Sequence, residues 1–173
     1  MILDELNQKM NDRVVQLRET KNKGTKIVGY FPGGYMPEEI VYACGAVPVA
    51  LNRGGDHEAV EVSGNYLSRW LYTFGRAHIG YKMLKNEPLY EMADIFIVPV
   101  TDNHVRMVAD AWNTFTDVEV FRFGVPHVKR EHALKYYLDG LILLKERLEK
   151  LTGTNMSEDK LKEAIDLGNK EGT

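Results

Sequence analysis

Hydrophobic residues recur along this chain at two spacings, and the spacing separates the expected helices from the expected strands. Residues 1–21 show steps of three and four between apolar positions, which predicts an amphipathic helix. Residues 134–151 repeat the pattern with leucine and tyrosine, and Gly153 is suited to end that second helix. A last helix is expected to begin at Ser157, because its hydroxyl can cap a helix and acidic residues follow it.

Short apolar runs bounded by glycine, proline or polar residues predict strands. The run at 93–100, ADIFIVPV, is the most apolar of the chain, as expected of a central parallel strand that is buried on both faces. The four expected strands cover residues 26–31, 46–52, 93–100 and 118–123.

Helical patterns lie between these strands. Pro37 and the two acids that follow it suit the first turn of a helix. The intervening helices are expected over residues 37–44, 65–84 and 103–113. Alternating strands and helices imply parallel pairing, so we predict a three-layer, Rossmann-like α/β fold: a mostly parallel sheet of about four strands with helices on both faces.

The same pattern divides the chain into three parts. Residues 1–25 form an N-terminal helix, residues 26–152 form the α/β domain, and residues 153–173 form a C-terminal helix and tail. No internal repeat and no low-complexity tract interrupts them.

Composition narrows the function classes. Lys and Arg number 22 against 25 Asp and Glu, for a formal net charge of -3, which argues against a nucleic-acid binder because such proteins need clustered, uncompensated cations. No stretch has the length of a membrane span or the uninterrupted apolar core of a signal peptide. The single cysteine, Cys44, fits a reducing cytoplasm, and we expect a small buried residue there rather than a nucleophile.

Ligands of parallel α/β sheets bind at the carboxyl ends of the strands, and one such end stands out here. Asp102, Asn103, His104 and Arg106 directly follow the most apolar strand. Asp102 either only caps the next helix or also faces a ligand, and His104 has the chemistry of a general acid or base. The other histidines are scattered without the spacing of a metal site, and neither GxGxxG nor a phosphate loop occurs.

Aromatic residues are concentrated in the expected helix at 65–84. They either line a pocket or belong to the core or an interface. They are Tyr66, Trp70, Tyr72, Phe74 and Tyr81.

Two stretches carry a family resemblance. Residues 26–31, KIVGYF, followed by residues 37–49, PEEIVYACGAVPV, resemble the N-terminal signature of the 2-hydroxyacyl-CoA dehydratase and benzoyl-CoA reductase family. Residues 54–56, the strand at 94–99 and the stretch 102–112 are similar to the reductase branch in order and spacing. The resemblance covers about residues 26–150.

The resemblance implies anaerobic enzymes whose subunits have two α/β domains and hold a [4Fe–4S] cluster near a CoA-thioester pocket. It implies one ligand cysteine after Pro99, where this chain has Asp102, and another at the position of Tyr72 or Thr73. A third belongs to a second domain beyond these residues. Because cluster iron is held by thiolates, we predict no cofactor bound by this chain alone and a [4Fe–4S] cluster in a partner subunit.

The leading hypothesis is a shortened, cluster-free relative that acts as an accessory or acyl-CoA-binding subunit, in a homo- or hetero-oligomer with a family member. The alternatives are a CoA-thioester enzyme in which Asp102 and His104 are catalytic, and a fragment of a longer subunit. The leucines of residues 134–151 either form an exposed surface that the family's second domain would cover, or pack on the chain's own sheet. Strand ends and resemblance together give the expected substrate-binding residues: Tyr35, Glu38, Glu39, Gly54, Gly55, Asp56, Asn103 and Arg106.

Overall fold

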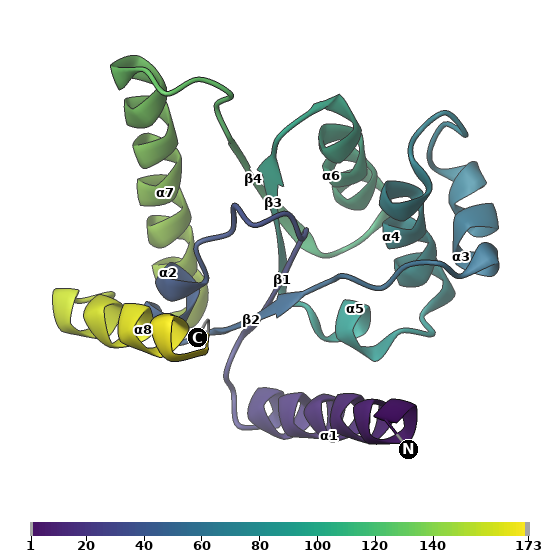
Figure 1. The fold of residues 1–173 in the computed structure, drawn as a ribbon, viewed down its shortest axis with the longest axis horizontal. Coiled ribbons are helices and arrows are strands. Elements are labelled where there is room, and N and C mark those ends of the chain that lie inside the picture. Colours follow the sequence, from purple (N-terminus) through teal and green to yellow (C-terminus); the bar gives the residue numbers. More distant parts are fainter. Residues whose placement is uncertain (1, 172–173) are drawn as a thin grey trace.

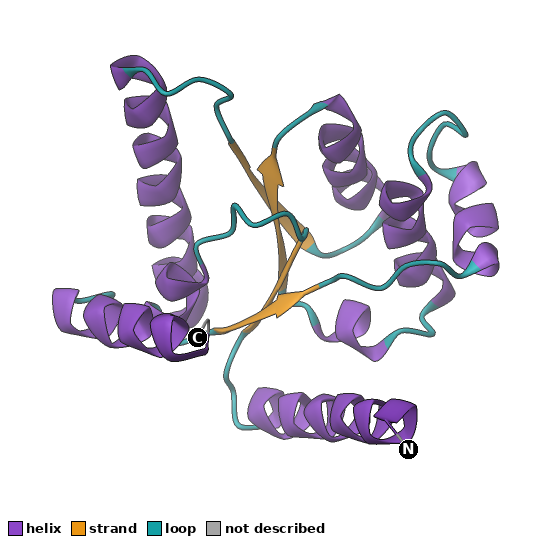
Figure 2. Cartoon of the chain, in the orientation of Figure 1, coloured by secondary structure: helices purple, strands orange, loops and turns teal. Residues whose placement is uncertain are grey.

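The computed structural model describes residues 2–171. Four strands in these residues form a sheet in which every neighbouring pair is parallel, with helices around it (Figure 1, Figure 2). The strands are β1 (Ile27–Tyr30), β2 (Val47–Ala50), β3 (Ile95–Val100) and β4 (Glu119–Gly124). The predicted three-layer α/β fold is therefore confirmed.

The strand order is β2-β1-β3-β4. Val28 of β1 lies opposite Pro48 of β2 and Ile95 of β3, and Val100 of β3 lies opposite Gly124 of β4. Since all four strands run the same way, the loops that follow them gather at one edge of the sheet, which we call the carboxyl edge.

Strand β3 connects the two halves of the core. Its side chains alternate between the faces of the sheet: Phe96 packs into an apolar cluster with Trp112, and Ile97 packs into a second cluster with Leu144. These four side chains are fully buried. The expectation of a central strand covered on both faces is confirmed.

The two clusters correspond to the two helical layers. One layer contains α1 (Ile2–Asn22), α3 (His57–Val62), α4 (Thr73–Leu84), α5 (Pro88–Met92) and α6 (Asn103–Phe115). The other, on the left of Figure 1, contains α2 (Glu38–Ala43), α7 (Glu131–Thr152) and α8 (Glu158–Glu171). Within residues 2–171, no helix combines the length and the apolar character that crossing a membrane requires.

The predicted ends of two helices are confirmed in atomic detail. Gly153 has a φ of +71°, and its N–H donates to the carbonyl of Glu149 at 2.8 Å, which ends α7 in a left-handed conformation. The hydroxyl of Ser157 accepts from the N–H of Lys160 at 3.3 Å, as a residue that caps the start of α8 should.

The predicted helix over residues 65–84 is wrong over residues 65–72. A 3-10 turn, η1 (Ser63–Asn65), and an irregular segment precede α4, which begins only at Thr73. Ser68 is the physical cause, because its hydroxyl accepts from the N–H of Trp70 at 3.3 Å and its carbonyl accepts from Leu71 at 3.1 Å. Local bonds of this kind compete with the helical ladder.

Two short helices, α3 and α5, were not expected from the pattern. Each has only five or six residues, too few for an apolar repeat to show. Pro88 at the start of α5 is a start signal that the sequence does contain.

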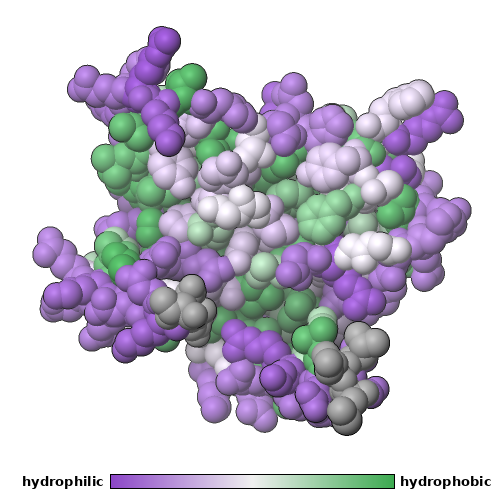
Figure 3. Space-filling model, in the orientation of Figure 1, coloured by the Kyte–Doolittle hydropathy of each residue, from purple (hydrophilic) through white to green (hydrophobic). Residues whose placement is uncertain are grey.

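The leucines of helix α7 lie on two different sides of the helix. Leu144 and Leu148 are fully buried against the sheet, whereas Leu134 is 61% and Leu138 is 55% exposed. Figure 3 shows hydrophobic side chains at the surface over α7, at the upper left. The chain therefore leaves part of this helix without an apolar neighbour.

Helices α3 and α4 approach each other at Gly80. A Cβ added there would overlap the backbone carbonyl of Ala59, which is fully buried. Gly64, by contrast, has open space around it, with the nearest atom of Arg76 4.0 Å from such a Cβ.

We expect Gly80→Ala to lower the free energy of unfolding by about 3 kcal/mol, because backbone atoms must separate to admit the methyl group. Urea titration of the variant checks this. Gly64→Ala is the matched control and should change stability by less than about 1 kcal/mol. Equal effects of the two substitutions would mean that the close contact of α3 and α4 is not what requires glycine.

His78 of α4 is fully buried among aromatic rings. Its ring lies 4.6 Å from that of Phe31 and 5.0 Å from that of Phe74, measured between centroids. Within the described part of the chain, neither ring nitrogen has a hydrogen-bond partner. Burial lowers the pKa of His78 to about 3, so the imidazole is neutral at physiological pH.

Since the pKa of His78 is lower in the folded than in the unfolded chain, acid must favour unfolding. The stability is present above the ordinary histidine pKa and is lost as pH falls toward 3, by a few kcal/mol, on the order of one kcal/mol per pH unit between these values. We expect His78→Leu to remove that part of the pH dependence, measured by urea titration at pH 7 and pH 4.5. His132→Leu, at an exposed histidine, should keep the wild-type fall. An unchanged fall in His78→Leu would contradict the assignment.

Candidate functional site

An open hollow of about 460 Å³ lies at the carboxyl edge, between the loops that follow β3 and β4. It combines backbone of the two strand ends with five polar side chains. The lining residues are Val100, Thr101, Asp102, Asn103, Gly124, Val125, His127 and Tyr136. Two predicted site residues, Asp102 and Asn103, are therefore part of one concave surface.

Asp102 is the cap of α6. One carboxylate oxygen accepts from the N–H groups of His104 at 2.7 Å and Val105 at 3.0 Å, and the other accepts from the hydroxyl of Thr101 at 3.1 Å. Partial burial alone would raise the pKa of Asp102, but these hydrogen bonds outweigh it and hold the pKa below its usual value. Asp102 is thus a carboxylate at neutral pH, with its acceptor capacity largely used by the protein.

Tyr72 and His104 form a stacked pair beside this cap. Their ring centroids are 5.4 Å apart and their planes differ by 13°. Burial, together with the negative charge of Asp102, raises the pKa of Tyr72 to about 12, so its phenol stays protonated. The fold therefore brings together Tyr72 from the start of α4 and Asp102 from the end of β3, which are 30 positions apart in the sequence.

His127 joins the two loops of the hollow. Its Nε2–H donates to the carbonyl oxygen of Thr101 at 2.6 Å. Tyr136 of α7 lies against Gly124, where a larger residue would overlap its phenol. Neither residue was among the predicted site residues, although His127 follows the fourth strand closely enough that its position at the carboxyl edge was a usable signal.

The loop after β1 makes a separate group of contacts. The hydroxyl of Tyr30 donates to Glu38, and the hydroxyl of Tyr137 donates to the carbonyl of Tyr35 at 3.2 Å. Burial and the charge of Glu39 raise the pKa of Tyr137. The predicted residues Tyr35, Glu38 and Glu39 thus interact with α7 or with β1, and none of them is among the lining residues of the hollow.

The loop after β2 is held against α4 by a hydrogen bond and contains an ion pair. Asp56 accepts from the hydroxyl of Tyr81 at 2.8 Å and pairs with Arg53 at 3.3 Å, and these bonds hold its pKa below the usual value. Gly54 lies against Phe74, and Gly55 has a φ of +90° that favours glycine. Gly54, Gly55 and Asp56 therefore share the carboxyl edge but not the hollow.

Arg106, the last predicted site residue, lies in the first turns of α6 with its side chain exposed. In the described residues it has no salt-bridge partner. Its guanidinium is available to an anion that approaches the carboxyl edge.

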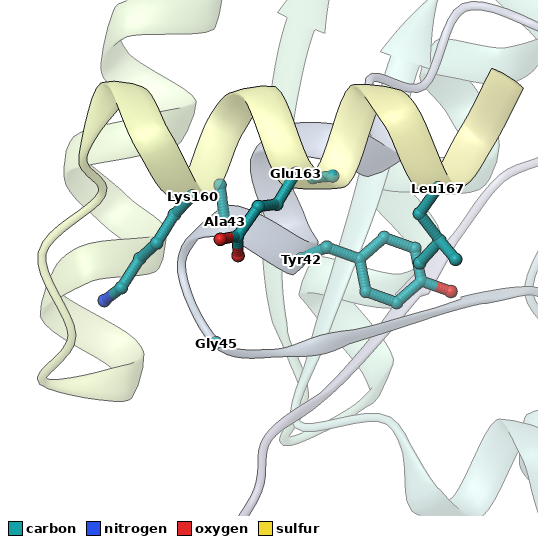
Figure 4. A pocket seen from close by; sticks show the side chains of 7 residues that line it. Tyr42, Ala43, Gly45, Lys160, Glu163 and Leu167 are labelled. Carbon is teal, nitrogen blue, oxygen red and sulfur yellow. The ribbon is translucent and has the colours of Figure 1, made fainter.

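A second hollow lies between α2 and α8. Figure 4 shows Tyr42 from α2 beneath α8 next to Leu167, with Lys160 and Glu163 toward the other end. Gly45 borders it and comes just before β2, so this hollow is near the amino end of a strand. Ligands of parallel sheets bind at the opposite end, which favours the hollow at Asp102.

Comparison with known proteins shows the family of this chain. The family model for the 2-hydroxyglutaryl-CoA dehydratase D-component matches residues 34–173. The chain belongs to this family. It is 26% identical over 171 residues to "Putative dehydratase subunit YjiM" of Escherichia coli (strain K12), and 27% identical over 146 residues to a benzoyl-CoA reductase subunit of Thauera aromatica.

These alignments cover 98% and 83% of this chain but only 44% and 37% of the two relatives. The chain thus spans less than half the length of the curated relatives that it matches.

The residues at the hollow do not fit an iron–sulfur cluster. The family resemblance implies one cysteine at the position of Asp102 and another at that of Tyr72 or Thr73. Tyr72 lies close to Asp102, and these three residues offer a carboxylate, a phenol and a hydroxyl instead of thiolates. Cys44, the chain's one cysteine, is buried in the cluster of Val41 and Leu148, and burial raises the pKa of its thiol to about 11. Across side chains 4–170, no three His, Cys, Asp or Glu residues converge on a common point.

Removing the cap should destabilise the edge that forms the hollow. We expect Asp102→Ala to lower the free energy of unfolding at pH 7 by about 1 kcal/mol, and Asp102→Asn by less, because asparagine also caps helices. The lowered pKa of Asp102 means that its stabilisation is lost as pH falls through that pKa, so Asp102→Asn should lose less stability in acid than wild type. Urea titration at several pH values measures both effects.

Asp139→Ala, at an exposed position of α7, is the control and should leave the stability within about 0.5 kcal/mol of wild type. Full stability of Asp102→Ala would show that α6 does not need the cap.

Proposed function

We propose that this chain is a CoA-thioester-binding domain of the dehydratase and reductase family that holds no cluster of its own and works beside a cluster-bearing partner subunit. One observation supports it most directly. At the carboxyl edge, Tyr72 lies close to Asp102, and the family resemblance implies thiolates at Asp102 and at Tyr72 or Thr73. Beside Asp102 lies a hollow of about 460 Å³ lined by polar side chains.

Thioester binding is supported by the names of the matched family and of one relative. The matched family model and the benzoyl-CoA reductase relative both name a CoA thioester. In this chain, Asn103 and Tyr136 line the hollow with groups that can donate hydrogen bonds to an acyl carbonyl. The ionised cap Asp102 orients α6 beneath them rather than serving as a proton donor.

A partner subunit is supported by the donor set and by the surface. A [4Fe–4S] cluster needs thiolates, and the thiol of Cys44 is buried away from the carboxyl edge. Both relatives are named as subunits. The exposed leucines Leu134 and Leu138 give such a partner an apolar surface to cover.

Calorimetric titration with benzoyl-CoA and acetyl-CoA tests thioester binding. We expect the wild-type chain to bind, and Asn103→Ala or Tyr136→Ala to weaken binding by about tenfold each, because each removes one hydrogen bond or contact in the hollow. His132→Ala, near the start of α7 and absent from the lining, should bind as wild type does.

The family name only suggests which thioesters to use as probes. The affinities of the hollow variants relative to wild type decide whether the hollow is the binding site. Equal affinity of the hollow variants and wild type, or no binding of either thioester, would overturn the proposed function.

A further inference from the structure

Trp70 is the most exposed large hydrophobic side chain in the described part of the molecule, at 78%. The turn at Ser68 causes this exposure. It places Leu67 and Leu71 in the core, with 9% and 6% exposure, and leaves the indole between them facing solvent. An exposed aromatic ring held by a structured turn is a surface on which another flat ring can stack.

The indole lies at the carboxyl edge. Trp70 precedes Tyr72 by two residues, and Tyr72 stacks on His104 beside the cap Asp102. Figure 1 shows the segment between α3 and α4 at the same end of the molecule as the start of α6. The segment that carries the indole therefore lies next to the loop of Asp102 and Asn103, which lines the hollow.

One cation contacts Trp70. The guanidinium of Arg69 lies 5.2 Å from the centre of the indole ring. Arg69 has no carboxylate partner among side chains 4–170. A stacking surface with an unpaired arginine suits a ligand that combines a flat heterocycle with phosphates.

We propose that Trp70 stacks on the adenine ring of CoA and that Arg69 binds its phosphates. This inference rests on the proposed function, because CoA carries its adenine and phosphates at the end opposite the thioester. One molecule then reaches from Trp70 to the hollow at Asn103. The site is a nucleotide subsite without a glycine-rich phosphate loop.

The test uses the two halves of CoA separately. The probe for this subsite is 3′,5′-adenosine bisphosphate, which has the base and phosphates without the thioester arm. The chain has two tryptophans, and since Trp112 is fully buried, quenching of exposed indole fluorescence reports on Trp70. We expect the probe to quench wild-type fluorescence, and its affinity, measured by calorimetry, to fall by about tenfold or more in Trp70→Ala.

Conservative variants separate stacking from folding. Trp70→Phe should retain most of the affinity because phenylalanine still offers a ring, and Arg69→Gln should weaken binding and reduce its dependence on salt. Phe115→Ala, at another exposed ring on α6, should bind the probe as wild type does. Far-ultraviolet circular dichroism confirms that each variant is folded.

Three outcomes would overturn the proposal: no binding of 3′,5′-adenosine bisphosphate to wild type, equal affinity of wild type and Trp70→Ala, or a change of oligomeric mass in Trp70→Ala with unchanged affinity, which would make Trp70 an interface residue. A pantetheine thioester, which lacks the base, tests the hollow alone. If it binds wild type and not Tyr136→Ala while the bisphosphate fails to bind, the proposed function stands and the stacking site does not.

Discussion

The burial of β3 on both faces is the constraint on which the rest of the structure depends. Phe96 and Ile97 point into opposite apolar clusters, and the strand is hydrogen-bonded to β1 on one side and β4 on the other. Because the strand is enclosed, its carboxyl end has a fixed position at the edge of the sheet. There Asp102 accepts hydrogen bonds from two N–H groups in the first turn of α6. The position of the candidate site is thus a consequence of the core.

The same constraint explains how much of the fold the sequence could predict. The run ADIFIVPV identifies β3 without its neighbours, because a fully enclosed strand has few polar side chains. Gly153 and Ser157 mark helix ends through local backbone bonds, which need no tertiary information. The late start of α4 could not be read from spacing, because Leu67 and Leu71 are four residues apart in a turn just as they would be in a helix.

The chain gives the location of Asp102 and Asn103 more readily than their contacts. Parallel strands bring their carboxyl ends together, and Asp102 and Asn103 do lie at a concave surface of that edge, where their role as site residues stays a prediction. Which loops contact which could not be deduced, since it depends on side chains such as Tyr81, which ties Asp56 to α4, and His127, which joins two loops across the hollow. The pairing of Tyr72 with His104 likewise arises from helix packing between distant parts of the chain.

Family membership and local chemistry thus point in different directions. The fold and residues 34–173 belong to a family named for dehydration of a CoA thioester, yet the corner where Tyr72 and Asp102 meet offers no thiolate, and the chain spans less than half of its relatives. The proposed function reconciles the two, with a thioester bound by this chain and iron held by another subunit.

Iron and acid-labile sulfide content per chain, measured after anaerobic purification from the native source, tests this account most directly. The account predicts no iron in the isolated 173-residue chain and iron in any complex that contains a larger cysteine-bearing subunit. About four irons per isolated chain, the content of one [4Fe–4S] cluster, would contradict it.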